Sequence, residues 1–312
     1  MIQLSAVVWL GLFINTVTSF IFPAVSRLGF YGVRARHDST QCPVGSRLGA
    51  GPAGGFNGRA AFLADTDEVY FKTILRRSLE STKEALEEGL GLLEIEFPPI
   101  RANDPTSAGT FDASAAFVRE FIKADVLASF GAELFVVFPE RSEKKIAERK
   151  FGDCTCTITS IDCVLENDTS LPSIRPKVLV VVAPGFNIPE YTDIAKFEQV
   201  WENCPTIIVV NGYLSRLRAG FYPALLYPGL AKVTKSFYSR FTSILTLSPL
   251  AVVGDRLGCW IARVYPSAWE VLLKTSSDDK YDVILESEGE PDSKKTWKMA
   301  TQLYKDRTGK LF

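Results

Sequence analysis

The cysteine side chains of this sequence could bind a metal ion or carry redox chemistry. Cys154, Cys156 and Cys163 lie close together, and the other cysteines are isolated. A structural zinc site would need a second pair of ligands at a matching spacing. The same pattern fits a Thr/Cys-rich strand over residues 155–165, in which cysteine packs as a small apolar side chain. We therefore expect neither a metal site nor a cofactor.

Histidine, a common catalytic base and metal ligand, is nearly absent. The single histidine, His37, lies in an N-terminal segment that we expect to be removed. Ser/His/Asp and Cys/His nucleophiles and His-containing metal sites are therefore unavailable to the mature chain. The sequence also lacks GxxxxGKS, GxxxxGKT and a GxGxxG after a strand, so neither common phosphate-binding loop is present. We expect a protein that is not an enzyme; catalysis by Arg, Tyr and carboxylates is the alternative.

Two further places could carry chemistry because of their residue types. Glu94 and Glu96 alternate with apolar residues on an expected strand, so both carboxylates point to one face. They could act as paired, glycosidase-like acids, although a polar strand face is the commoner cause of this pattern. Residues 183–187, Ala-Pro-Gly-Phe-Asn, lead from a strand to a helix, and an anion could bind at that helix start. An ordinary βα turn explains the same residues.

Arginine and aromatic residues are concentrated in residues 210–229, VNGYLSRLRAGFYPALLYPG. Arg216 and Arg218 lie there among tyrosines and prolines, and residues 263–269, RVYPSAW, repeat the same residue types. Such side chains are good interface anchors because they bury a large area and form directional hydrogen bonds. They could equally close the core over the ends of a sheet. Both interpretations stay open at this point.

The spacing of apolar residues predicts alternating helices and strands around these positions. Helices are expected over residues 65–89, 112–130, 142–151 and 192–204, the last capped by Thr192. Strands are expected over residues 92–98, 133–139, 178–184 and 206–211. Strands separated by helices of this length favour βαβ units and a parallel sheet.

The C-terminal part of the chain changes character. Closely spaced strands are expected over residues 243–250, 259–266, 269–275 and 281–287, followed by a helix from Pro291 to about Tyr304. Short turns between these strands favour antiparallel pairing. We therefore expect an α/β fold, a three-layer αβα arrangement with a mostly parallel, Rossmann-like sheet and an antiparallel C-terminal extension. Residues 61–312 would form it as a single domain.

The N-terminal segment has the composition of targeting sequences. Residues 4–17 form an apolar run of signal-peptide length, and small side chains precede a cut after Ser19. Residues 20–60 are basic, hydroxylated and nearly free of acids, as in transit peptides. We expect a signal peptide over residues 1–19, then a plastid transit peptide and linker over 20–60. With Phe20 after the cut, this leader resembles the bipartite presequences of algae with secondary plastids, such as diatoms.

The charge distribution argues against a nucleic-acid partner. The whole chain carries a net charge of −1, and residues 1–60 contain five arginines and a single acid, so the remainder carries −5. A mildly acidic body lacks the basic surface that binds phosphate backbones.

Five segments occur in an order that resembles a known family: LLEIEFPP, LFVVFPE, VLVVVAP, NGYLSRLRAGFYPALLYPGLAK and RVYPSAWEVLL. Over about residues 66–306 the chain is similar to a plastid and cyanobacterial domain-of-unknown-function (DUF) family. That family includes the Low PSII Accumulation proteins, which help photosystem II assemble, and its domain is also fused to a chloroplast adenylate kinase. The kinase half has no counterpart in this sequence, so its activity is not implied. The family has no established catalytic residues to carry over.

The resemblance implies a shared binding surface. The residues that match the family pattern are Asn211, Gly212, Leu214, Arg216, Arg218, Gly220, Tyr222, Pro223, Tyr265, Pro266 and Trp269. The implied function is a non-enzymatic plastid factor that assists photosystem II or thylakoid complex assembly by docking, in the stroma or at the stromal face of the thylakoid. Its partners would be photosystem II assembly intermediates or thylakoid insertion machinery, and peripheral membrane association is compatible with this role. Replacing Arg216 and Arg218 by alanine is expected to weaken docking and leave the fold intact.

The alternative is a nucleotide- or small-molecule-binding regulatory module of the plastid stroma. The expected fold class and the family's fusion to adenylate kinase motivate it. The same arginines would then face a phosphate group. The sequence carries no signal for an oligomeric state.

Overall fold

A computed structural model of the protein describes residues 67–98, 110–152, 154–166, 168, 171–185, 187–201, 205–251, 258–274 and 281–308. Every described residue belongs to one compact unit, Ala53–Phe312. The predicted signal peptide, transit peptide and linker lie outside the described residues.

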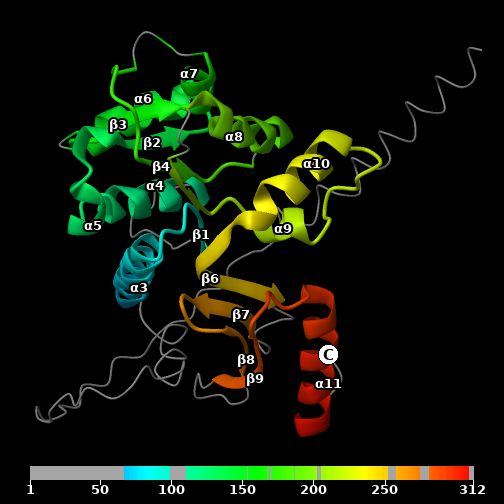
Figure 1. Ribbon diagram of the computed structural model, residues 1–312. Coiled ribbons are helices and arrows are strands. Elements are labelled where there is room, and N and C mark those ends of the chain that lie inside the picture. The colour runs from blue at the N-terminus through cyan, green and yellow to red at the C-terminus, as the bar shows by residue number, and fades with distance from the viewer. Residues whose placement is uncertain are drawn as a thin grey trace, which may run out of the picture. The chain divides into compact units, whose positions relative to one another are not determined.

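The described strands form one sheet in the order β3-β2-β4-β5-β1-β6-β7-β8-β9 (Figure 1). Their bounds are Leu92–Glu96 (β1), Leu134–Phe138 (β2), Thr157–Ser160 (β3), Val178–Val182 (β4), Thr206–Val210 (β5), Thr242–Ala251 (β6), Cys259–Val264 (β7), Trp269–Lys274 (β8) and Tyr281–Ser287 (β9). Pairing is parallel from β3 through β6 and antiparallel from β6 to β9. The predicted α/β class, with a mostly parallel sheet and an antiparallel C-terminal extension, is confirmed.

The helices connect and cover these strands. Their bounds are Asp67–Glu87 (α3), Thr110–Phe121 (α4), Asp125–Ala128 (α5), Arg141–Phe151 (α6), Ile161–Leu165 (α7), Ile188–Val200 (α8), Leu214–Arg218 (α9), Pro228–Ser236 (α10) and Ser293–Thr308 (α11), with short 3-10 turns at Gly131–Glu133 (η2) and Tyr238–Arg240 (η3). Among the described helices, none combines the length and apolar character needed to cross a bilayer.

Alternation along the central strands creates two hydrophobic cores, one on each face of the sheet. On β4, Val180 packs into a first core with α3, α4 and α6, and Leu179 packs into a second core with α7, α8, α9 and α10. Helices cover both faces of the sheet at the central strands, so all side chains of β2 and β4 are buried. A third core joins β7 and β8 to α11, which lies beside this end of the sheet (Figure 1). The residues of all three cores lie within Ala53–Phe312, so we expect this unit to fold by itself.

Two predicted helices have different bounds in the structure. The helix expected over 112–130 is divided into α4 and α5. The helix expected to start at Thr192 begins at Ile188, so the predicted Thr192 cap is wrong. Asn187 and Glu190 form a capping box there, and the Thr192 hydroxyl donates to the Pro189 carbonyl at 2.7 Å. Proline in the first turn is compatible with a helix because its missing N–H would have no partner there.

Two strand predictions also change. The single strand expected over 155–165 is β3 followed directly by α7. The chain must cross back over β2 to reach β4, and α7 begins this crossover. The strand expected over 243–250 is β6, which pairs in parallel with β1 and antiparallel with β7. It therefore ends the parallel part of the sheet and begins the antiparallel extension.

Candidate docking surface

Asn211, one of the predicted site residues, lies at the end of β5 beside β1. Parallel sheets usually bind ligands at a point of this kind, where successive connections leave on opposite faces. The chain leaves β1 towards α4 and leaves the adjacent β5 towards α9, which pack on opposite faces of the sheet. Asn211 is fully buried at this point. Its Oδ1 accepts from the Phe97 N–H and its Nδ2 donates to the Ser114 hydroxyl, both at 2.9 Å. The crevice between β1 and β5 is thus filled by the protein's own amide.

Replacing Asn211 by alanine should destabilise the domain by about 2 kcal/mol, because the buried Phe97 N–H loses its acceptor and the Ser114 hydroxyl loses a donor. Asn211 also has a φ of 52°, a conformation that asparagine tolerates better than alanine. Urea denaturation would measure the change. Ser114→Ala is the matched control and should have a smaller effect, since it removes one of the two hydrogen bonds. Equal stability of Asn211→Ala and wild type would contradict this role.

The helix start after β4 is likewise occupied by a side chain of the protein. Glu190 accepts hydrogen bonds from the backbone N–H groups of Gly185 at 2.7 Å and Asn187 at 3.0 Å. Gly185 has a φ of 110°, and a Cβ there would lie 2.0 Å from the Tyr191 hydroxyl. A carboxylate therefore lies where the sequence suggested that an anion could bind. The residues of this turn therefore cap α8 and pack against Tyr191.

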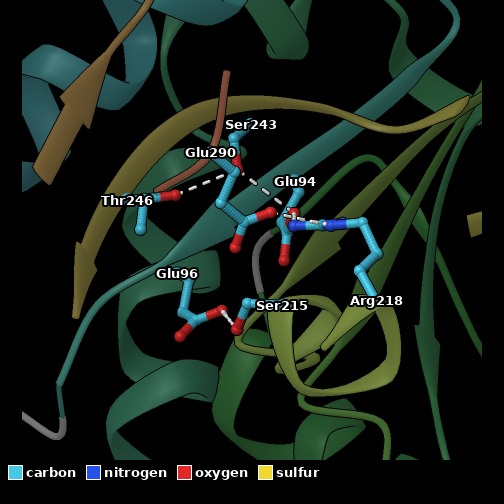
Figure 2. A network of polar contacts seen from close by, with 7 residues as sticks. All are labelled: Glu94, Glu96, Ser215, Arg218, Ser243, Thr246 and Glu290. Atoms are coloured by element: carbon cyan, nitrogen blue, oxygen red, sulfur yellow. Dashed lines mark hydrogen bonds and ion pairs between the residues drawn. The ribbon is translucent and has the colours of Figure 1, made fainter. Parts of the chain in front are cut away.

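Glu94 and Glu96 lie in a buried ion cluster and not on the polar strand face that the sequence favoured (Figure 2). Glu94 is fully buried, and its Oε2 accepts from Arg218 Nη2 at 2.8 Å and from the Ser243 hydroxyl at 3.1 Å. Arg218 Nε donates to Glu290 at 2.9 Å. The cluster therefore ties together β1, α9, β6 and the segment before α11. Sequence periodicity could not reveal it, because the partners are 124 and 72 residues away from Arg218.

Burial and the neighbouring charges shift the pKa values of three side chains in this cluster. Burial raises the pKa of Glu96 to about 8, and the Glu94 charge adds to the effect, while a hydrogen bond from Ser215 opposes it. Burial also raises the pKa of Glu290. For Arg218, burial lowers the pKa, but Glu94 and Glu290 outweigh it and raise the pKa overall. The cluster thus holds Arg218 charged between carboxylates and favours a protonated Glu96 at neutral pH.

Three observations on the described residues concern metal binding, thiol reactivity and access to the carboxylates. The described residues contain no group of three or more His, Cys, Asp or Glu side chains that could hold a metal ion. Burial raises the pKa of the Cys156 thiol to about 12, so this thiol is protonated and a poor nucleophile. Glu94 is inaccessible to a substrate because it is fully buried. The buried ion cluster of Glu94, Glu96, Arg218 and Glu290, hereafter the carboxylate cluster, therefore supports α9 and the loop that follows it.

Residues 221–227, hereafter the apolar loop, connect α9 to α10 and are firmly anchored. At the start of the loop, the Phe221 N–H donates to the Arg216 carbonyl at 3.0 Å. Within it, the N–H groups of Leu226 and Tyr227 both donate to the Pro223 carbonyl at 3.0 Å. The Tyr222 ring packs edge-on against Phe221 and Tyr227, at centroid distances of 5.2 and 5.9 Å. These contacts give the loop a defined shape.

The apolar loop nevertheless exposes large apolar side chains. The exposed fractions are 92% for Leu225, 66% for Leu226, 60% for Phe221 and 37% for Tyr227. Among the described residues, other exposed large apolar side chains, such as Ile146 and Ile174, lie apart from this loop in the sequence. Contiguous exposed apolar surface of this kind typically marks an interaction site.

Basic side chains lie on both helices that flank the apolar loop. Residues 203–254 contain five basic residues and no acid. Arg218 and Arg240 form ion pairs, whereas Arg216, Lys232 and Lys235, hereafter the cationic rim, form none with a described residue. Arg216 is exposed and lies over the Tyr213 ring, 4.3 Å from its centroid. Between α9 and α10 lies a shallow pocket of about 220 Å³ whose lining includes Tyr222, Ala224 and Lys235.

The residues predicted to form a shared surface are distributed between surface and core. Arg216, Gly220 and Pro223 are exposed and Tyr222 is half-buried, so these contribute to the surface around the apolar loop. Four residues are buried supports: Asn211, Gly212, Leu214 and Trp269. Gly212 is required by close packing, since a Cβ there would lie 2.4 Å from Val209 Cγ1.

Tyr265 and Pro266 belong to a different neighbourhood. The Tyr265 hydroxyl donates to Glu88, and its carbonyl accepts from the Ser81 hydroxyl at 2.9 Å, which fastens it to α3 and its C-terminal end. Tyr222 instead packs with the second core, near Tyr191. Tyr265 packs against the first core, which lies on the opposite face of the sheet. The predicted set therefore does not form one continuous surface, although its role in binding stays a prediction.

Sequence reasoning did not select Phe221, Leu225 and Leu226, the most exposed apolar residues of the loop. A signal was present, because FYPALLY lies between Gly220 and Pro228 and is too short and irregular for a core helix or strand. Apolar residues in such a connection have no obvious place in the core.

Comparisons with known proteins agree with the family resemblance at a coarse level. No curated protein and no solved structure matches the chain. One family model, described as Domain of unknown function (DUF1995), matches residues 69–297, which includes β1, the carboxylate cluster and the apolar loop. The chain therefore belongs to the DUF1995 family.

Proposed function

We propose that this protein is a docking factor that acts by binding and not by catalysis. The observation that carries the proposal is the apolar loop, where Phe221, Leu225 and Leu226 are held exposed on a well-anchored connection. Exposed apolar side chains are unfavourable in water, so a fixed display of them is expected to have a partner. Arg216, close to the loop and stacked on Tyr213, adds a charged anchor of the kind enriched at interfaces.

The proposed setting is the assembly of photosystem II or another thylakoid complex in a plastid. Its support is the resemblance of NGYLSRLRAGFYPALLYPGLAK to the Low PSII Accumulation proteins and the targeting composition of residues 1–60. The string that carries the resemblance includes the whole apolar loop. The domain would dock at the stromal face of the thylakoid, where assembly intermediates or insertion machinery are its partners.

A small-molecule function is less well supported. Asn211 fills the crevice between β1 and β5, and Glu190 occupies the N-terminus of α8. Arg218, one of the two arginines expected to face a phosphate, already pairs with two carboxylates. The exposed apolar side chains of the loop therefore support docking better than the occupied polar positions support small-molecule binding.

Replacing Leu225 and Leu226 by serine should lower capture of photosystem II subunits from plastid stroma and thylakoid fractions by at least about tenfold, because truncated apolar anchors lose most of their binding energy. Capture by tagged Ala53–Phe312 would be quantified by mass spectrometry. The matched control replaces Ile146 and Ile174, exposed by 41% and 44%, with serine and should capture as wild type does. Equal capture by the Leu225/Leu226 variant and the control would contradict docking through the loop.

A further inference from the structure

We propose that the apolar loop inserts into an anionic lipid surface. This inference rests on the proposed docking function and names the surface to which the loop binds. It follows from the chemistry of the loop, its shape and the charges around it. The exposed apolar tip, together with the cationic side chains beside it, favours a lipid surface over the groove of a protein partner.

The tip of the loop has the composition of a membrane-inserting segment. Leu225, Leu226 and Phe221 are its most exposed large apolar side chains, and they carry no polar group that would oppose entry into hydrocarbon. Pro223 and Pro228 flank the two leucines and have no backbone N–H to leave unsatisfied. The N–H groups of Leu226 and Tyr227 are already bonded to the Pro223 carbonyl, so they do not need water.

Aromatic residues lie at the base of this tip. Tyr222 is half-buried and Tyr227 is partly exposed, and their rings pack together. Tyrosine is favoured at the boundary between lipid and water, because its ring is apolar and its hydroxyl remains hydrated. The two tyrosines are therefore suited to the headgroup level when the leucines enter the hydrocarbon.

The charges around the loop match anionic headgroups. The cationic rim of Arg216, Lys232 and Lys235 forms no ion pair with a described residue, so its charges are available to an external anion. Lysine and arginine side chains can extend their apolar stems along a membrane and keep the charge at the surface. Residues 203–254 contain no acid, and the carboxylates of Glu94, Glu290 and Glu198 that approach this segment are paired with Arg218 or Arg240. A cationic rim around an apolar tip combines the two attractions that hold peripheral proteins on anionic membranes.

The loop is also arranged before it binds. Leu217 and Leu230 bury α9 and α10 in the second core on either side of it, and Arg218 fixes the end of α9 to Glu94 and Glu290. Binding therefore does not require ordering of a flexible segment, which keeps the entropic penalty low. The same anchors would hold the domain in one orientation on the lipid surface.

Flotation with lipid vesicles tests the inference. Purified Ala53–Phe312 would be mixed with vesicles of phosphatidylcholine alone or with 30% phosphatidylglycerol, and the bound fraction measured. The variants are Leu225→Ser/Leu226→Ser and Lys232→Gln/Lys235→Gln, with Ile146→Ser/Ile174→Ser as the matched control. Melting temperatures within about 2 °C of wild type establish that each variant is folded.

We expect wild type and control to bind the anionic vesicles at least about tenfold better than neutral ones. The leucine variant should lose at least about tenfold in partitioning because its apolar tip is removed. The lysine variant should lose about tenfold on anionic vesicles only, and added salt should reproduce that loss. No vesicle binding by wild type, or binding unchanged in the leucine variant, would overturn the inference.

The two proposals fail in distinguishable ways. If the leucine variant loses capture from plastid fractions while wild type does not bind vesicles, the loop docks on a protein and only the lipid inference is overturned. If wild type binds anionic vesicles through the loop but captures no assembly component, the lipid inference stands and the photosystem II function is overturned.

Discussion

Arg218→Met should destabilise the domain by about 3 kcal/mol, the largest effect expected from a single replacement in the carboxylate cluster. The variant removes the charge that pairs with Glu94 at 2.8 Å and with Glu290 at 2.9 Å. Glu94 would then be a buried carboxylate with Ser243 as its remaining described hydrogen-bond donor. Methionine retains apolar packing, so the loss reports the charge and not a cavity. Thermal and urea denaturation would measure it.

Arg216→Ala is the matched control for this prediction, since Arg216 is exposed on the same helix and has no ion pair with a described residue. It should change the stability by less than about 1 kcal/mol. The double variant Glu94→Leu/Arg218→Met should recover much of the loss, because both buried charges are then removed. An unchanged stability of Arg218→Met would show that the ion pairs contribute nothing. The sequence predicted that replacing Arg216 and Arg218 leaves the fold intact. Because Arg218 pairs with Glu94 and Glu290, we now expect a loss of stability for Arg218.

Glu96→Gln should make the domain more stable than wild type at pH 9, by roughly 2–4 kcal/mol. The pKa of Glu96 is about 8 in the folded protein, against an ordinary value of 4.5. Between these values the folded state holds a proton that the unfolded state releases, so rising pH removes stability until it passes the folded pKa. Glutamine has no proton to release and should lack this loss.

Denaturation of wild type and variant between pH 4 and pH 9 would check the prediction. The two proteins should have similar stability near pH 4, and the difference should grow as the pH rises. Glu80→Gln is the matched control, because Glu80 is half exposed on α3 and its replacement should change the stability by less than about 1 kcal/mol. A constant difference between Glu96→Gln and wild type across this range would contradict a raised pKa for Glu96.

The secondary structure was predictable where a sequence pattern fits only one kind of element. Residues 178–182 and 206–210 are continuous aliphatic or β-branched runs, and strands of this kind require cover on both faces. Helix boundaries were less predictable, because Thr192 and Asn187 are both acceptable caps and Glu190 decides between them in the folded chain. The parallel pairing of β6 with β1 was not predictable, since strand order depends on contacts distant in sequence.

The sequence by itself determined the α/β class, the lack of a His-based active site outside the predicted leader, and the Arg/Tyr segment that carries the family resemblance. These follow from residue type and local spacing, which act over a few residues. Only the tertiary structure decided that Asn211 and Arg218 are internal ties and that Phe221, Leu225 and Leu226 are displayed. Whether an arginine or a leucine is buried depends on what other elements place beside it. That packing is a property of the whole folded domain.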